Sequence, residues 1–141
     1  MQDTELCVGH RCLIFHLEHA NTAPQNLRNF LMDDRVTFAG FWNHSDRRKL
    51  EISWLRLMMR TDPVDLRLCT ETNDGRSLNR ASVNTIVEEC LGFAVDQRNK
   101  MMSFSLWKAE FLSYEQVEYA SIDAHCAFLI ARDFEVWNLV W

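Results

Sequence analysis

The chain has 141 residues, of which 48% are hydrophobic and 11% aromatic, and it carries a net charge of −5. This composition excludes a disordered chain and predicts one globular domain over residues 1–141. The negative charge disfavours non-specific coating of nucleic acid, so any such contact needs a local patch or bound cations. No stretch resembles a signal peptide or is long enough to span a bilayer, so no membrane partner is predicted.

The cysteines indicate the compartment. There are five of them, an odd number, and none lies at C-x-x-C spacing: Cys7, Cys12, Cys69, Cys90 and Cys126. This usage favours reduced thiols in an intracellular protein. We therefore expect a location in the nucleus or cytoplasm.

The first predicted elements are a hairpin, a helix and a strand. Two β-type runs at residues 5–8 and 12–17 flank Gly9 and predict a hairpin with a short turn. A proline then precedes a short helix that ends at Leu31, with apolar residues at helical spacing. Residues 36–42 form a nearly continuous apolar run, which predicts a central strand covered on both faces.

The middle of the chain continues the alternation of strand and helix. Asn43, His44 and Ser45 are cap candidates before a helix predicted over residues 46–58. Its expected apolar stripe is Leu50, Trp54, Leu57 and Met58. Residues 63–69 alternate polar and apolar, which predicts a further strand.

Two more helices complete the prediction. Ser82 can cap a helix over residues 83–91 that stops at Gly92. Residues 93–107 are irregular, and Ser113 with Gln116 has the pattern of a capping box before a helix through about Phe134. The apolar stripe expected on that helix is Val117, Ala120, Ala124, Ala127, Phe128 and Ala131. Strands that alternate with helices predict an α/β domain.

Three stretches carry the motifs that bear on function: FAGFWNHSDRRKLE, SLNRASVNTIVEECLG and LSYEQVEYASIDAHCAFLIARDF. The first places Asp46 near the carboxyl end of a predicted strand, where open α/β sheets hold their sites. In the third, Tyr119 and Asp123 are four residues apart and share a helix face. With these motifs the whole chain resembles the DEDD-type 3′–5′ exonucleases of ribonuclease H-like fold. It is most similar to the branch with ribonuclease D, the Werner-syndrome exonuclease domain and short plant relatives.

The resemblance implies a fold and an activity. The fold is a ribonuclease H-like mixed β-sheet flanked by helices, and the activity is hydrolysis of DNA or RNA phosphodiesters from the 3′ end. Asp46 and Asp123 would be ligands of Mg²⁺ or Mn²⁺, and Tyr119 would position the attacking water. Such sites use two cations about 4 Å apart, which carboxylates hold as hard oxygen ligands. Trp107 also follows the family's pattern.

The acidic pair Asp3 and Glu5 matches the form of the family's first motif, D-x-E. Two carboxylates two apart on a strand point to the same side and could hold a cation together. In the family, however, a connection separates this strand from the next, whereas here Glu5 runs straight into the strand of residues 5–8. We interpret the pair as lying outside the metal site and predict that the family's first strand is missing.

The missing strand leaves two further functional hypotheses beside a working exonuclease. One is an inactive nucleic-acid-binding or protein-interaction module, and the other is a truncated gene product. A missing interior strand would also leave unpaired edges at residues 5–8 and 36–41, which predicts marginal stability and self-association through them. The basic run from Arg47 to Lys49 could contact phosphates or form a solvated helix face.

Overall fold

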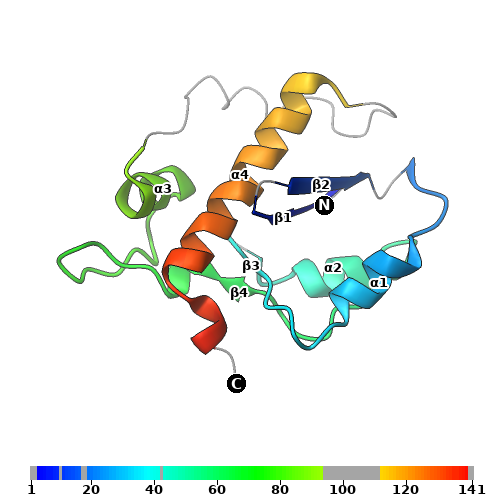
Figure 1. Cartoon of the computed structure of the whole chain (residues 1–141), viewed down its shortest axis with the longest axis horizontal. Helices are drawn as coiled ribbons and strands as arrows, with labels where there is room; N and C mark the ends of the chain where they lie inside the picture. The colour runs from blue at the N-terminus through cyan, green and yellow to red at the C-terminus, as the bar shows by residue number, and fades with distance from the viewer. Residues whose placement is uncertain (1–2, 10, 17–18, 42, 94–111, 140–141) are drawn as a thin grey trace.

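The computed structural model describes residues 3–9, 11–16, 19–41, 43–93 and 112–139. Its strands are β1 (Asp3–Val8), β2 (Arg11–His16), β3 (Ala39–Gly40) and β4 (Val64–Asp65). Its α-helices are α1 (Gln25–Leu31), α2 (Asp46–Ile52), α3 (Val83–Leu91) and α4 (Tyr114–Asp133), and two short 3₁₀ turns are η2 (Leu66–Leu68) and η4 (Val136–Leu139). Figure 1 shows α4 between α3 on one side and the β1–β2 hairpin on the other. The predicted α/β class is confirmed.

The strands form two small sheets. β1 pairs antiparallel with β2 from Asp3 opposite His16 to Val8 opposite Arg11, which confirms the predicted hairpin. Gly9 closes the turn at φ +61°, a conformation that glycine adopts without steric cost. β3 pairs parallel with β4 over two residue pairs. Within the described residues, the expectation of one mixed sheet is therefore wrong, because neither pair joins the other.

The predicted central strand at residues 36–42 is much shorter than expected. Only Ala39–Gly40 forms a ladder, and β4 is its partner. None of residues 36–41 is buried, and Thr37 is exposed. The run is apolar, but within the described chain no strand pairs with the second edge of β3. A strand with a neighbour on one side only cannot bury both of its edges.

The predicted helix at residues 46–58 is also too long, since α2 ends at Ile52. Ser53 leaves the helix in an extended conformation, and its hydroxyl donates to the Leu50 carbonyl at 2.6 Å. A serine that bonds the local backbone in this way competes with the next helical turn. In the predicted stripe the two leucines are buried, but Trp54 is 68% exposed and Met58 46%.

The predicted strand at residues 63–69 is interrupted after two residues. The Asp65 carboxylate accepts from the backbone N–H of Arg67 at 3.1 Å and from its guanidinium at 2.8 Å. This local pairing turns the chain into η2. Side-chain capping therefore ends the strand where the polar–apolar alternation predicts continuation.

Both C-terminal helices are confirmed, together with their caps. Ser82 accepts from the Thr85 backbone N–H at 3.2 Å, and Gly92 ends α3 in the left-handed conformation. At the start of α4, the Ser113 hydroxyl accepts from the Gln116 N–H at 3.1 Å. The Gln116 side-chain oxygen in turn accepts from the Ser113 N–H at 2.9 Å. This reciprocal pair is a capping box.

The buried residues form two separate clusters. One joins α3, α4 and the turns near them: Leu66, Leu78, Ile86, Val87, Cys126, Ala127, Ile130 and Val136. The other joins α1 and α2 to the segment after α2: Leu27, Leu31, Leu50, Leu55, Leu57 and Met59. On α4, Ala120 and Ala127 are buried as predicted, whereas Val117 is exposed and Ile130 is the fully buried residue. Two cores thus leave room for a pocket between them.

Two findings bear on the remaining predictions. Across the part of the chain that the structure describes, no helix combines the length and apolar character that a bilayer crossing requires. The irregular stretch predicted after α3, which contains Trp107, lies almost entirely outside the described residues.

Candidate active-site pocket

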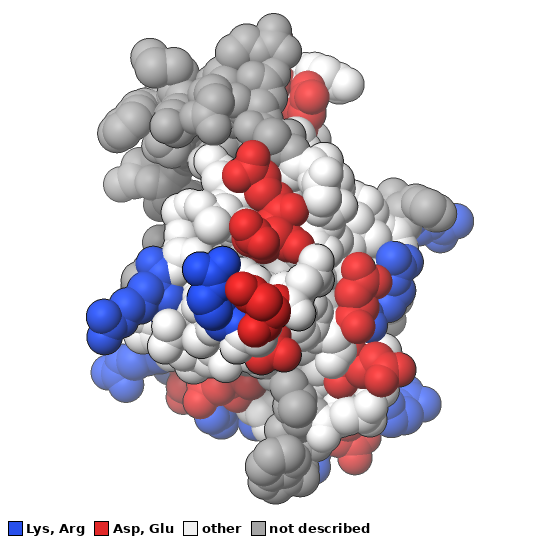
Figure 2. All heavy atoms as spheres, turned by 90° about the vertical axis from the view of Figure 1, so that its left-hand side faces the viewer, with Lys and Arg blue, Asp and Glu red and all other residues white. Residues whose placement is uncertain are grey.

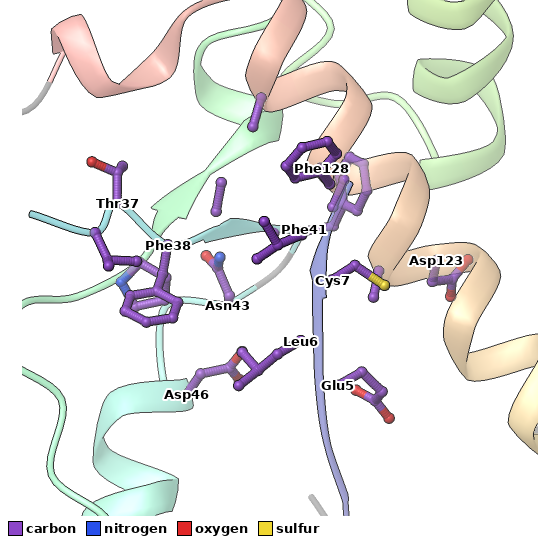
Figure 3. A pocket seen from close by; sticks show the side chains of 18 of the residues that line it. Glu5, Leu6, Cys7, Thr37, Phe38, Phe41, Asn43, Asp46, Asp123 and Phe128 are labelled. Carbon is purple, nitrogen blue, oxygen red and sulfur yellow. The ribbon is translucent and has the colours of Figure 1, made fainter. Parts of the chain in front are cut away.

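A pocket of about 940 Å³ lies between β1, the segment around β3 and the side of α4. Its lining includes all three residues predicted to form the site, namely Asp46, Tyr119 and Asp123, together with Glu5. Figure 3 shows α2, β1 and α4 arranged around it. The pocket therefore brings together Asp46 and Asp123, which are 77 positions apart in the sequence.

Asp46 is held at the first position of α2. Its backbone N–H donates to the Asn43 carbonyl at 3.1 Å. The Asn43 side chain is buried and donates to the Val64 carbonyl on β4 at 3.0 Å, so it ties the start of α2 to the small parallel sheet. Burial raises the pKa of Asp46, and the charges of Lys49 and His44 oppose that rise. Asp46 is thus a half-buried carboxylate anchored through Asn43.

Tyr119 and Asp123 lie one helical turn apart on α4, as their spacing predicts. Burial raises the pKa of the Tyr119 hydroxyl, and the nearby Asp123 charge raises it further. Burial also raises the pKa of Asp123, although its side chain reaches solvent. A tyrosine with a raised pKa keeps its proton at neutral pH. It can therefore donate a hydrogen bond beside a carboxylate.

The pocket does not gather these carboxylates into a closed ligand set. Among the described residues, no group of three or more histidines, cysteines or acids could hold a metal ion. In Figure 3, Asp46 and Asp123 stand on opposite sides of β1, which carries Leu6 and Cys7 between them. The predicted pair therefore shares one pocket, while β1 separates its two members in this conformation.

Two pocket residues were absent from the predicted site. Glu5, which the sequence predicts to lie outside the metal site together with Asp3, lies on β1 opposite Ile14 and lines the pocket. Asn43 was considered only as a cap candidate. It occupies the wall, and its Oδ1 is buried without a hydrogen-bond partner among the described residues. The short spacing from Asn43 to Asp46 is the sequence signal that could have pointed to it.

Among the described residues that line the pocket, the basic side chain is that of Arg35, which pairs with the Asp33 carboxylate at 2.8 Å. Arg47 donates from Nε to the Met59 carbonyl at 3.1 Å, so part of its guanidinium serves the fold. Arg48 and Lys49 are exposed at the start of α2. Figure 2 shows acidic and basic side chains interspersed on the face beside α3, with no continuous basic patch across it. That face lacks the electrostatic footprint of a non-specific nucleic-acid surface.

The cysteines differ in part from the prediction of reduced thiols. Cys7 and Cys12 face each other across the hairpin and form a disulfide, with Cα atoms 4.1 Å apart. The other cysteines, Cys69, Cys90 and Cys126, are free thiols, as predicted. The odd count concealed the pair, because the hairpin register that aligns the two residues is not visible in cysteine spacing.

Comparisons with known proteins give one curated relative and several solved structures. A scan against protein families gives no match. The chain is 27% identical over 132 residues to the bifunctional 3′-5′ exonuclease/ATP-dependent helicase WRN of Mus musculus. That alignment covers 89% of this chain and 9% of the mouse protein, so the chain spans only a small part of its relative. This similarity supports a relationship to 3′–5′ exonucleases.

Solved structures similar to this chain include crystal structures of the EXD2 exonuclease domain. One, soaked in Mn, has a TM-score of 0.37 and 26% identity and covers 92% of this chain and 62% of that chain. Another, soaked in Mg and GMP, has a TM-score of 0.43 and 25% identity and covers 99% and 71%.

Proposed function

We propose that this chain is a 3′–5′ exonuclease-type domain of ribonuclease H-like ancestry that hydrolyses nucleic acid from its 3′ end. One observation carries the proposal: Asp46, Tyr119 and Asp123, which match the family's motifs, line a single pocket although they lie on two helices. The sequence similarity to a 3′-5′ exonuclease/helicase points in the same direction. The substrate class is DNA or RNA with a free 3′ end.

The donor set suits a divalent cation. Asp46 and Asp123 each offer carboxylate oxygens, and since Mg²⁺ or Mn²⁺ commonly takes one or two carboxylates plus water and substrate phosphate, a cation beside one of them does not require the other across β1 as a direct ligand. Bound there, the cation would neutralise phosphate charge and favour a hydroxide nucleophile. Because the described pocket offers no cluster of three ligands, we expect waters and the substrate to complete the coordination.

The residues themselves have separable roles. Tyr119 keeps its proton and can orient a water by hydrogen bonding, since its pKa is raised. Asn43 fixes the backbone at the start of α2 and so holds Asp46 against the pocket wall. Exposed Arg48 and Lys49 lie close to Asp46 in the chain and can attract a phosphate backbone.

The test is an exonuclease assay on DNA and RNA, single- and double-stranded, with Mg²⁺ or Mn²⁺. We expect shortening from the 3′ end that excess chelator abolishes. Asp46→Asn and Asp123→Asn should each remove the activity, and Tyr119→Phe should reduce it less completely. Asp133→Asn, on the exposed side of the same helix, is the matched control and should act like the wild type.

Other outcomes would change the assignment. Activity that survives chelation, or equal activity in all three site variants, would place the chemistry elsewhere. Binding of nucleic acid without cleavage would favour an inactive binding module. We further propose that the protein is intracellular, in nucleus or cytoplasm, and that residues 1–141 fold as one domain. Self-association through the edges of β1 and β3 remains a prediction, which sedimentation would test.

A further inference from the structure

The hairpin disulfide lies where the hairpin meets α4. Cys7 and Cys12 are directly opposite each other in the β1–β2 register, so their side chains point to the same face of the hairpin. Both sulfur atoms lie 3.9 Å from the backbone oxygen of Ser121, a residue of α4. Because α4 packs against both strands of the hairpin, the disulfide is part of that packing contact.

The two ends of the disulfide differ in their surroundings. Cys12 is exposed on β2, whereas Cys7 is half-buried and lines the pocket. Figure 3 shows the sulfur of Cys7 between β1 and α4, on the side of the strand where Asp123 lies. A small thiol in solution can therefore reach the sulfur of Cys12, while the structural effect of breaking the bond extends to Cys7 in the pocket wall.

Three observations favour a disulfide that exchanges with other thiols over one that serves only the fold. Its Cys12 end is open to solvent, and exposed disulfides exchange more readily than shielded ones. It links residues only 5 apart in the sequence, so it removes little conformational freedom from the unfolded chain. The hairpin itself holds the two cysteines opposite each other, since they belong to a ladder of six residue pairs. Reduced thiols on this ladder stay close enough to be oxidised again.

We propose that Cys7 and Cys12 form a reversible redox modification site, which exchanges with a low-molecular-mass thiol and its disulfide and changes how the hairpin packs on α4 beside Asp123. A thiolate attacks the Sγ atom of Cys12, the bond between the two cysteines breaks, and Cys7 leaves as a thiolate that takes a proton from water. A second thiolate attacks the external sulfur of the mixed disulfide and releases Cys12, which is protonated in turn. The protein disulfide gains two electrons and two protons, and two external thiols become one disulfide. Oxidation is the reverse reaction.

Reduction changes the contact with Ser121 in two ways. Bonded sulfur atoms are about 2 Å apart, whereas non-bonded heavy atoms settle at roughly 3.5–4 Å, so the two sulfur atoms separate when the bond breaks. They then cannot both keep their present positions against the Ser121 oxygen. Each sulfur also gains an S–H group, a weak donor that the disulfide lacks. Because Ser121 lies two residues before Asp123 on α4, a shift of the hairpin at this point is a shift beside Asp123.

The first experiment measures the exchange in the full chain. The protein is equilibrated at varied ratios of reduced to oxidised glutathione and quenched with acid, and its free thiols are alkylated and mapped by mass spectrometry. We expect Cys7 and Cys12 to pass together from disulfide to thiols and back, while the other cysteines stay free of protein disulfides at every ratio. A disulfide that glutathione reduces only in denaturant would be structural and would overturn the proposal. Thiols that no ratio joins would overturn it as well.

Two single-cysteine variants of the hairpin test which sulfur reacts with the external thiol. In oxidised glutathione, Cys7→Ser should form a mixed disulfide at Cys12 at least about tenfold faster than Cys12→Ser forms one at Cys7, because the exposed sulfur is more accessible. Equal rates, or a faster reaction at Cys7, would contradict attack at Cys12 and overturn the proposed mechanism.

Hydrogen–deuterium exchange tests the effect on α4, with and without dithiothreitol and with α3 as an internal reference. Reduction should speed exchange of the amides around Ser121 at least about threefold, because the hairpin that covers them is no longer tied by the disulfide. Cys12→Ser should match the reduced wild type in both buffers. Equal exchange in the two redox states, or an equal change in α3, would overturn the proposed effect on packing.

These measurements are independent of the nuclease hypothesis. The central comparison uses the wild-type chain in two redox states, so a folding defect in a variant leaves its result intact. None of the readouts requires cleavage of nucleic acid. Failure of the nuclease hypothesis therefore leaves the redox proposal standing, and failure of the redox proposal leaves the nuclease hypothesis standing.

Discussion

The N-terminal cap of α4 gives a direct test of how this helix supports the site. Ser113→Ala removes the hydroxyl that accepts from the Gln116 N–H at 3.1 Å. Gln116 is buried, with 6% of its surface exposed, so water replaces the lost acceptor poorly. Ser82→Ala removes the matching bond to Thr85 on α3, where Thr85 is exposed and water can substitute. The two variants remove the same kind of bond in two environments.

The magnitudes follow from that difference. Loss of a serine cap costs about 0.5–2 kcal/mol. We expect Ser113→Ala to lower the free energy of unfolding by about 1.5–2 kcal/mol, because the buried N–H loses its acceptor. We expect Ser82→Ala to cost about 0.5–1 kcal/mol. For a chain of this size each kcal/mol corresponds to a fall in Tm of roughly 3–5 °C.

Urea unfolding of both variants and the wild type, at one pH, measures the two costs. An unchanged m-value would show that the variants differ in stability rather than in the surface exposed on unfolding. If Ser82→Ala cost as much as Ser113→Ala, burial of the freed N–H would not control the cost of the cap. An unaffected Ser113→Ala would mean that the capping box does not form in solution.

Three further predictions concern the pocket and the hairpin. The raised pKa values of Asp46 and Asp123 mean that the folded state holds their protons more tightly than the unfolded chain, so the contribution of these two groups to stability falls as pH rises from about 4 through those pKa values. Asp33 acts in the opposite direction, because its bonds with Arg35 lower its pKa to about 2, so the test is the difference between wild type and Asp123→Asn, which should lose the Asp123 part of the fall in urea unfolding. Gly40→Ala places a Cβ 3.0 Å from the Asn43 amide nitrogen, and displacement of that amide should cost about 1–2 kcal/mol in the same assay. Reduction of the hairpin disulfide, with its sequence separation of 5, should cost no more than about 2 kcal/mol, measured as a shift of the urea midpoint with dithiothreitol. A pH dependence that Asp123→Asn leaves unchanged, a neutral Gly40→Ala or a much larger reduction effect would contradict these three in turn.

Local signals predicted the ends of the chain well. The hairpin follows from apolar runs around Gly9, and both C-terminal helices follow from cap residues that the structure pairs as expected. Tyr119 and Asp123 share a helix face because a spacing of four fixes that relation in any α-helix. These features depend on contacts between residues close in sequence, which sequence patterns record directly.

Features that depend on distant partners were predicted less well. The apolar run at residues 36–42 carries the composition of a buried strand, but a central strand needs neighbours on both edges, and among the described residues β3 has β4 on one edge only. Likewise Trp54 has the spacing of a core residue, yet the helix ends before it, and its indole N–H donates to the Ala20 carbonyl at 3.1 Å. Periodicity shows which side chains could be buried, and the partner decides which of them are.

Glu5 shows the same limit at the site. Its place in a D-x-E pattern first suggested a metal ligand, and its direct continuation into the hairpin argued against that role. In the structure, Glu5 lines the pocket for a different reason: β1 packs on α4 and borders the cavity. Glu5 and Asp123 therefore line the same pocket although one lies on a strand near the start of the chain and the other on its last long helix, a relation that no local sequence pattern records. α4 contributes both apolar residues of the pocket, such as Ala127 and Phe128, and two residues of the proposed active site, so its packing against β1 determines which side chains meet there.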